Sequence, residues 1–285
     1  MFLSSVDIRE MTARDLDFCL EMFRITGWGN TADDVRRMIS YEPGGCFAAS
    51  LRGEDVGIVG SIGYGEVGYL GNLIVLPEYR GRGIGAALMN EAMEHLLDSG
   101  VKSIRLDSVP KAIPLYQRLG FRKESPSLRF TGRASERESK GCDRMMESDL
   151  PAVLSLDKEF FGAPRGRVLR RVYADFPGLC FVAREGSRLV GFIMAKEGEG
   201  RSRIGPWICE PNEWVIAENL LHRLMDEVAG STLWAGVPEG NRGSVEILER
   251  NGFISGPSSH RMCHGECGET GIVEGIFGVG GPDKG

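Results

Sequence analysis

The sequence predicts an α/β fold that occurs twice in succession. Segments that have the pattern of strands alternate with amphipathic helical segments through the first half of the chain. That half recurs in the second, because residues 43–77 and 177–211 align without a gap at an offset of 134, and ten of the 35 positions are identical. A repeat this long indicates domain duplication, since solenoid repeats are several-fold shorter. We expect domains at 1–134 and 141–285, with the seam in the polar stretch 131–143.

The elements of the first half follow from apolar spacing and from turn residues. They give the order β-α-α-β-β-β-α-β-α-β, in which the third helix closes at Gly100 and the fourth follows Pro110. The expected helices are 15–24, 32–39, 84–100 and 112–120, and the strands after the first are 46–51, 56–64, 69–76, 103–109 and 121–130. The second half repeats this scaffold, since LERNGF there matches YQRLGF in the first half.

Composition and charge limit the class of protein. The apolar and charged fractions, 42% and 26%, are those of a globular protein with a sizeable core. No apolar run reaches the length of a membrane span, and Asp7 and Arg9 interrupt any leader-like start, so we expect a cytoplasmic protein with no membrane partner. A formal net charge of −6 argues against a nucleic-acid binder. The seven cysteines, spread from Cys19 to Cys267, predict reduced and mostly buried thiols.

The stretch PEYRGRGIGAAL places a glycine-rich turn between a strand and a helix. The N–H groups at a helix start are unpaired and carry the positive end of the helix dipole, so anions bind there. Gly81, Gly83 and Gly85 allow a phosphate to approach these amides closely. Arg80 and Arg82 can add charge-assisted hydrogen bonds. The turn therefore predicts a phosphate-binding site.

Two other phosphate-binding loops fit this turn less well. A Walker loop is excluded because no Lys-Ser or Lys-Thr follows the glycines. The dinucleotide fingerprint is met by Gly81, Gly83 and Ala86, and Asp107 stands 21 residues beyond Ala86, where an acid could bind ribose. In that fold, however, the first glycine directly follows the first strand, whereas this turn follows three strands and four intervening residues. A nicotinamide-dependent oxidoreductase is therefore the weaker alternative.

The pattern Arg-x-x-Gly-x-Gly is matched by Arg80, Gly83 and Gly85. Together with GNLIVLPEY before the turn and PLYQRLGF after the next strand, it resembles the GNAT superfamily of N-acetyltransferases over about residues 6–131. The resemblance implies a mixed, mostly antiparallel sheet flanked by helices, with acetyl-coenzyme A as cosubstrate and no metal. It further resembles the two-domain type, in which a catalytic N-terminal GNAT domain precedes a degenerate one.

The family's cofactor site carries over onto matching positions of this sequence. The resemblance implies that the turn amides hold the pyrophosphate of acetyl-coenzyme A. It also implies that the preceding strand splays from its neighbour and pairs with the pantetheine arm, and that the Val75 N–H polarises the thioester carbonyl. The implied cofactor-binding residues are Leu73, Ile74, Val75, Arg80, Gly81, Arg82, Gly83, Ile84, Gly85, Ala86 and Tyr116.

The implied reaction is direct attack of a primary amine on the thioester, through an oxyanion held by a backbone N–H. Tyr116 matches the family's hydroxyl that faces the leaving sulfur. A phenol titrates near ~10 and a thiol near ~8.5, so we expect a hydrogen bond to the emerging thiolate more than early proton transfer. The amine must also lose a proton before attack. Asp107 and Glu66 are candidates for that base, and a water chain to bulk solvent is an equal alternative.

The acceptor site is less defined. In TGWGNTADD, which joins the first two helices, Trp28 and Asp33 could contact an amine by stacking and by charge. The partner is then a small-molecule or protein amine. In the second half NEWVIAENLL replaces the glycine turn and Leu248 stands in the place of Tyr116. We expect that half to bind no acetyl-coenzyme A and to help shape the acceptor site.

The C-terminal stretch HRMCHGECGETG offers four metal-binding side chains. His260, Cys263, His264 and Cys267 could ligate zinc, but four ligands within eight residues rarely wrap one ion, so we expect no metal. A non-catalytic acyl-coenzyme A sensor or scaffold would carry the same glycine turn as an enzyme. The sequence leaves the acceptor amine and the oligomeric state open.

Overall fold

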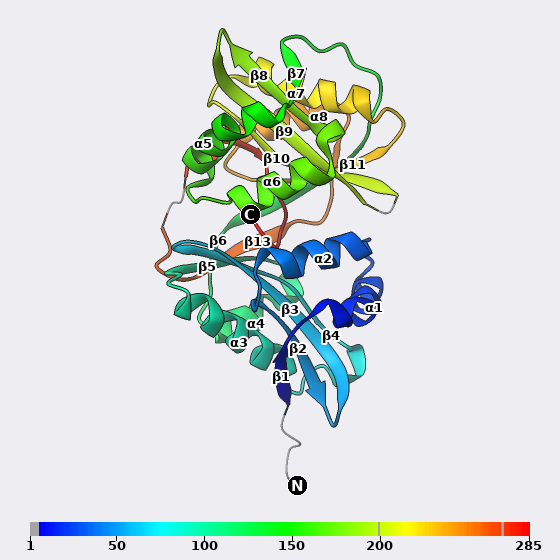
Figure 1. The fold of residues 1–285 in the computed structure, drawn as a ribbon, viewed down its shortest axis with the longest axis vertical. Coiled ribbons are helices and arrows are strands. Elements are labelled where there is room, and N and C mark those ends of the chain that lie inside the picture. The colour runs from blue at the N-terminus through cyan, green and yellow to red at the C-terminus, as the bar shows by residue number, and fades with distance from the viewer. Residues whose placement is uncertain (1–5, 199, 269–270) are drawn as a thin grey trace. The chain divides into compact units, whose positions relative to one another are not determined.

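The computed structural model describes residues 6–198, 200–268 and 271–285 (Figure 1). The chain forms two compact units. The first unit runs to Lys123 and includes Met262–Cys267 and Lys284, whereas the second comprises Glu124–Arg261, Gly268–Asp283 and Gly285. These units do not follow the linear division expected at 134 to 141, because each takes one strand from the other half of the chain.

The first unit has the order of elements that its apolar spacing predicts. Its strands are β1 Asp7–Glu10, β2 Cys46–Leu51, β3 Glu54–Tyr64, β4 Val67–Val75 and β5 Ser103–Ser108, and its helices are α1 Leu16–Thr26, α2 Ala32–Tyr41, α3 Ile84–Asp98 and α4 Ile113–Arg118. Helix α1 ends at Gly27 in the left-handed conformation, and α2 begins with a capping box between Thr31 and Asp34. The strand order is β1-β2-β3-β4-β5, followed by the end of β13 (Ser259–Gly265).

Two buried clusters hold helices against this sheet (Figure 1). The first joins α1 and α2 to the sheet and contains Met22 and Ile74. The second joins α3 and α4 to the sheet and contains Leu88, Tyr116 and Leu70. Strand β4 contributes to both clusters, as the alternation of side chains along a strand requires. The expected α/β fold with a mixed, mostly antiparallel sheet is therefore confirmed for this unit.

The second unit repeats the same plan. Its helices are α5 Leu150–Phe161, α6 Gly166–Asp175, α7 Trp214–Glu227 and α8 Arg242–Arg250, and its strands are β6 Arg122–Arg133, β7 Cys142–Arg144, β8 Cys180–Glu185, β9 Arg188–Gly198, β10 Arg201–Cys209, β11 Thr232–Pro238, β12 Ile254–Ser255 and β14 Ile276–Gly278. The strand order is β6-β11-β10-β9-β8-β7, with β12 beside β6 and β14 beside β10.

The offset of 134 residues seen in the sequence is also the offset of the strands. Strands β2, β3 and β4 begin and end 134 residues before β8, β9 and β10. The matched pairs Cys46 with Cys180 and Phe47 with Phe181 are buried in both units. The duplication therefore preserves the strand ends as well as the apolar core.

The final strand of each half completes the sheet of the other unit. Strand β6, which follows α4 in the chain, pairs antiparallel with β11 from Ser127 opposite Pro238 to Arg133 opposite Thr232. Its Phe130 is buried in the core of the second unit. In return, the end of β13 lies beside β5, and its Met262 joins the core of the first unit. Sequence spacing could not reveal this exchange, because strand pairing over such separations depends on tertiary contacts.

The expectation that all thiols are reduced is wrong for two of the seven cysteines. Cys263 and Cys267 form a disulfide, so neither sulfur is available as a thiolate ligand for zinc. The other five are free, and four of them are buried. Burial raises the pKa of the Cys19 and Cys180 thiols to about 12, which keeps both protonated at neutral pH.

Candidate functional site

Strands β4 and β5 separate toward their C-terminal ends. Their parallel pairing covers only Val67 to Tyr69 of β4, although β4 continues to Val75 and β5 to Ser108. The register of β4 against β3 shifts in the same region, where Asn72 has a positive φ of 56°. A bulge of this kind bends a strand and increases its twist. The splay that the resemblance implied is therefore present, and a bulge at Asn72 accompanies it.

The backbone of Val75 faces the gap that this splay opens. Hydrogen-bonded and non-bonded residue pairs alternate along an antiparallel ladder. The Leu76 N–H donates to the Val56 carbonyl of β3, so Val75, one residue earlier, directs its N–H and C=O away from β3. Its C=O accepts a hydrogen bond from Arg80 Nε at 2.9 Å. The Val75 N–H thus points to the side on which β5 has separated.

The glycine turn lies between β4 and α3. After a short 3-10 turn, Pro77–Tyr79, the exposed Gly81 and Gly83 have φ values of 76° and 83°. A Cβ at either position would meet nothing within 4 Å, so the requirement for glycine there is conformational. Left-handed residues next to a helix start turn successive N–H groups to one side, which makes an anion-binding concavity.

Helix α3 begins without a side-chain cap. Its N-cap is Gly83, and its first turn contains no acidic residue. The first intrahelical bond runs from the Ala87 N–H to the Gly83 carbonyl, so the amides of Ile84, Gly85 and Ala86 precede the helical ladder. These N–H groups and the helix dipole favour a bound anion.

Arg80 and Arg82 brace the turn from its two sides. Arg80 binds the Val75 carbonyl as described, and Arg82 Nη2 donates to the Glu78 carbonyl at 3.0 Å. The Arg82 guanidinium also lies 5.3 Å from the centroid of the Tyr79 ring, and the Tyr79 hydroxyl donates to Glu54 at 2.7 Å. Both arginines are exposed, so each can present remaining N–H donors to an anion at the turn.

Tyr116 lies in the same apolar cluster as Ile84, Leu73 and Val75. Its side chain is 9% exposed, and its ring meets the edge of Phe121 at 6.0 Å between centroids. Within the described residues its hydroxyl has no hydrogen-bond partner. Burial raises the pKa of Tyr116 to about 12. Transfer of its proton to a thiolate of ordinary pKa would therefore cost about 5 kcal/mol, so this hydroxyl is suited to donate a hydrogen bond and keep its proton.

The two carboxylates considered as general bases lie at different ends of the sheet. Asp107 is half-buried near the end of β5, where β4 and β5 have already separated. Glu66 lies in the turn between β3 and β4, at the end of β4 opposite to Val75, and its exposed carboxylate pairs with Lys102 at 2.6 Å. Nine residues of extended chain span roughly 30 Å, so the structure does not bring Glu66 to the glycine turn. This is a correction, and Asp107 alone stays a candidate of the two.

The two residues considered for the acceptor lie around the start of α2. Trp28 is 40% exposed, and its ring centroid lies 6.3 Å from that of Phe23. Asp33 is exposed and pairs with Arg36 at 2.7 Å. The side chain that caps α2 is its neighbour Asp34. Trp28 thus offers a partly accessible ring, whereas the Asp33 carboxylate already has a cation.

Sequence reasoning missed two features of this site. One is Asn72, whose side chain is of the kind that tolerates a positive φ; an Asn next to Gly71 inside a strand pattern is a signal for a bulge. The other is His264, whose ring lies 5.5 Å from that of Phe121 and so stands behind Tyr116. His264 comes from the exchanged strand β13, and no local pattern could have placed it there.

The second unit lacks these features at the matching place. Only residues 210–213 separate β10 from α7, against 76–83 between β4 and α3. The N-cap of α7 is Glu213, whose negative charge opposes anion binding, and Trp214 follows it. Leu248, which matches Tyr116, is fully buried. The glycine turn therefore belongs to the first unit.

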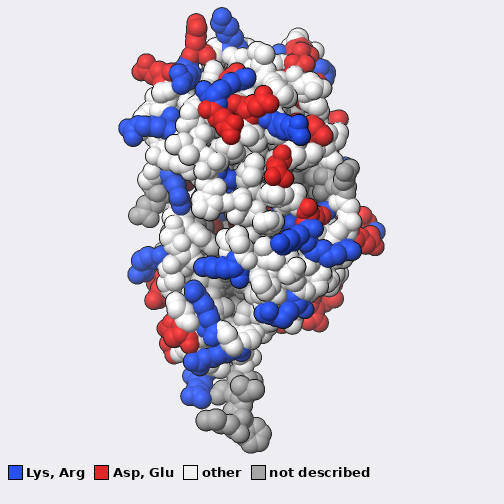
Figure 2. Space-filling model, turned by 180° about the vertical axis from the view of Figure 1, so that it is seen from behind, with Lys and Arg blue, Asp and Glu red and all other residues white. Residues whose placement is uncertain are grey.

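The dinucleotide alternative does not fit the order of strands. The turn follows β4, the fourth strand of the first unit, whereas a dinucleotide fingerprint follows the first. On the face that Figure 2 shows, Lys and Arg side chains are interspersed with Asp and Glu, which fits the acidic overall charge better than a nucleic-acid footprint. Within the described residues, no helix is both long and apolar enough to span a bilayer.

Comparison with known proteins gives one family for both halves. A model of the acetyltransferase (GNAT) family matches residues 13–121, and a model of an acetyltransferase (GNAT) domain matches residues 153–278. A holothin acyltransferase of Pseudoalteromonas sp. (strain SANK 73390) is 23% identical over 242 residues, which cover 84% of this chain and 81% of that protein.

Solved structures share the fold. A Pyrococcus horikoshii protein described as an acetyltransferase matches with a TM-score of 0.83 at 22% identity, over 100% of this chain and 98% of that one. A tandem GNAT protein from the clavulanic acid biosynthesis pathway matches with a TM-score of 0.64 at 13% identity, over 93% of this chain and 100% of that one.

Proposed function

The chain belongs to the GNAT family of acetyltransferases through both of its halves, and on this premise we propose that it transfers an acetyl group from acetyl-coenzyme A to a primary amine. Acyl transfer is the chemistry of the family and of the acyltransferase relative. The observation that carries the proposal is the uncapped start of α3 behind two left-handed glycines, next to a gap between β4 and β5. In our proposal the reaction takes place in the first unit.

The residues of the turn fit the diphosphate of such a cosubstrate. Gly81 and Gly83 supply the left-handed backbone, and the amides from Ile84 to Ala86 precede the helical ladder. Arg80 and Arg82 stand at the turn with donors to spare. A diphosphate is a good match for this donor set, because both amides and guanidinium groups form strong hydrogen bonds to anionic oxygen.

The chemistry follows from where the donors of the first unit lie. Acetyl-coenzyme A supplies a thioester carbonyl that an amine can attack. In the proposal, the Val75 N–H holds the oxyanion that forms, because it points into the gap between β4 and β5. Tyr116 donates a hydrogen bond to the departing thiolate and keeps its own proton, since burial raises its pKa to about 12. Asp107, or water in contact with it, accepts the proton of the amine.

Two measurements test this function. Calorimetric titration with acetyl-coenzyme A should show one site per chain, and a Gly83→Val variant should lose that site. Thiol release from acetyl-coenzyme A should then rise above the background with at least one member of an amine panel made of polyamines, amino acids, aminoglycosides and peptide N-termini. Binding without turnover across the whole panel would instead favour a non-catalytic sensor, and absence of binding would overturn the proposal.

A further inference from the structure

The second unit also contains a gap between two parallel strands, and a segment of the same chain fills it. Strands β10 and β11 pair only from Ser202 opposite Leu233 to Ile204 opposite Ala235, and the register of β10 against β9 then shifts, as it does in β4. Beyond that point β14 pairs with β10, with Gly278 opposite Trp207. Trp207 is the position that matches Leu73 of the first unit.

The backbone that β14 meets is the counterpart of the backbone that faces the gap in the first unit. The Glu210 N–H donates to the Val190 carbonyl, as the Leu76 N–H does to Val56. The alternate residues of β10 therefore direct their backbone groups away from β9, toward β14. Strand β14 thus uses the edge of β10 that corresponds to the exposed edge of β4.

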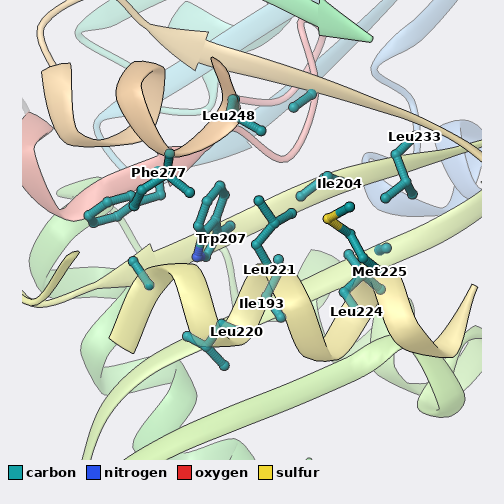
Figure 3. Close-up of a cluster of buried hydrophobic side chains, with 14 of the residues drawn as sticks. Ile193, Ile204, Trp207, Leu220, Leu221, Leu224, Met225, Leu233, Leu248 and Phe277 are labelled. Atoms are coloured by element: carbon teal, nitrogen blue, oxygen red, sulfur yellow. The ribbon is translucent and has the colours of Figure 1, made fainter. Parts of the chain in front are cut away.

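Side chains of α8 hold β14 in this position. Asn241 Nδ2 donates to the carbonyls of Glu274 and Ile276 at 2.9 and 3.0 Å, and the Ser244 hydroxyl donates to the Phe277 carbonyl. Both α8 side chains are buried. The Phe277 ring is itself fully buried and lies 5.3 Å from the Trp207 ring between centroids, as Figure 3 shows. Backbone pairing, polar side chains and core packing therefore act on one short segment.

Glycines on both sides permit this close approach. A Cβ at Gly205 would lie 1.9 Å from the Val279 carbonyl oxygen, and one at Gly236 would lie 2.8 Å from the Val279 side chain. The Val279 N–H donates to the Gly236 carbonyl. Arg165, buried and paired with Asp157 at 2.8 Å, donates to the Gly285 carbonyl at 2.7 Å. The segment is thus fitted along its length.

We propose that the gap of the second unit is a strand-accepting site, and that its permanent occupant is the segment around β14, in the place that the pantetheine arm takes in a cofactor-binding unit. The comparison with pantetheine rests on the function proposed for the first unit, whereas the seating of β14 does not. The second unit is blocked twice, because α7 also begins at Glu213 without the glycine turn. Its core is complete without a cofactor.

Hydrogen exchange of the full chain tests this assignment. The amides of 276–279 should exchange as slowly as those of β10, to within about 10-fold, and acetyl-coenzyme A should not change their rates. Phe277→Ala removes the buried ring and should speed their exchange by about 100-fold. The control, Ile272→Ala, changes a side chain that is 40% exposed in the same segment, and should change the rates by less than about 3-fold.

A milder variant covers the case in which Phe277→Ala does not fold. Ser244→Ala removes the donor to the Phe277 carbonyl and should speed exchange at β14 by about 10-fold. Unprotected amides at 276–279 in the unaltered chain, or faster exchange there when acetyl-coenzyme A is added, would overturn the proposal. Failure of the first unit to bind acetyl-coenzyme A would leave β14 protected, so the two proposals fail in different ways.

Discussion

The two units share a bulged strand and a parallel pair that separates, and they differ in what stands at the gap. In the first unit β4 leads into left-handed glycines and an uncapped α3. In the second, β10 leads directly into Glu213 at the start of α7, and β14 lies beside β10. The sheets are nearly superimposable in sequence register, so the sheet alone does not decide the chemistry. A short loop and one added strand separate a candidate enzyme site from a closed core.

Glycine conformation should give the largest difference between the units. Gly83→Val forces a β-branched residue into φ near 83° and displaces the turn, so kcat/KM for acetyl-coenzyme A should fall roughly 100-fold. Gly230→Val is the matched control, because Gly230 in the second unit has φ of 88° and equal open space. It should lose similar stability by thermal melting and retain activity. Equal activity losses in both variants would mean that strain alone acts.

The matched positions Tyr116 and Leu248 sharpen the comparison at the leaving group. Tyr116→Phe removes one hydroxyl that lacks a partner in the described part of the chain, so kcat should fall about 10- to 100-fold with little change in melting temperature. Leu248→Met conserves volume in the second unit and should leave kcat unchanged. Steady-state kinetics measures both, and an undiminished kcat in Tyr116→Phe would contradict the assigned role.

The arginine of the turn should have a smaller effect. Arg82→Ala removes an exposed cation, so KM for acetyl-coenzyme A should rise by roughly 3- to 10-fold, more at low salt than at high salt. Arg188→Ala in the second unit breaks exposed ion pairs with Glu185 and Glu210 and should leave KM unchanged. A KM that is independent of salt in both variants would indicate that Arg82 does not face the cosubstrate.

The pH dependence should show the smallest effect. Because burial raises the pKa of Tyr116 to about 12, its neutral form persists as pH rises through the ordinary range of a phenol near ~10. The ratio of kcat between the unaltered chain and Tyr116→Phe should therefore stay constant from pH 7 to about 10. A ratio that collapses near pH 9 would show that this hydroxyl loses its proton early and would overturn the hydrogen-bond role.

Local sequence was enough for the elements and for the turn. Apolar spacing predicted the helices and strands of the first half in order, because one buried face imposes its period on the residues. Gly81 and Gly83 could be recognised as turn residues because only glycine takes their backbone conformation at low cost. The repeat at 134 residues predicted a second unit without the turn, since the missing glycines are visible in the sequence itself.

The tertiary structure alone decided which segments complete each sheet and fill each gap. The exchange of β6 and the end of β13, the disulfide between Cys263 and Cys267, and the seating of β14 all join residues that lie far apart in sequence or carry no diagnostic pattern. It also removed Glu66 from the site, because the two ends of one strand lie far apart in space. Short strands of three or four residues have little period of their own, so their partners are chosen by the edges and cavities that the rest of the fold presents.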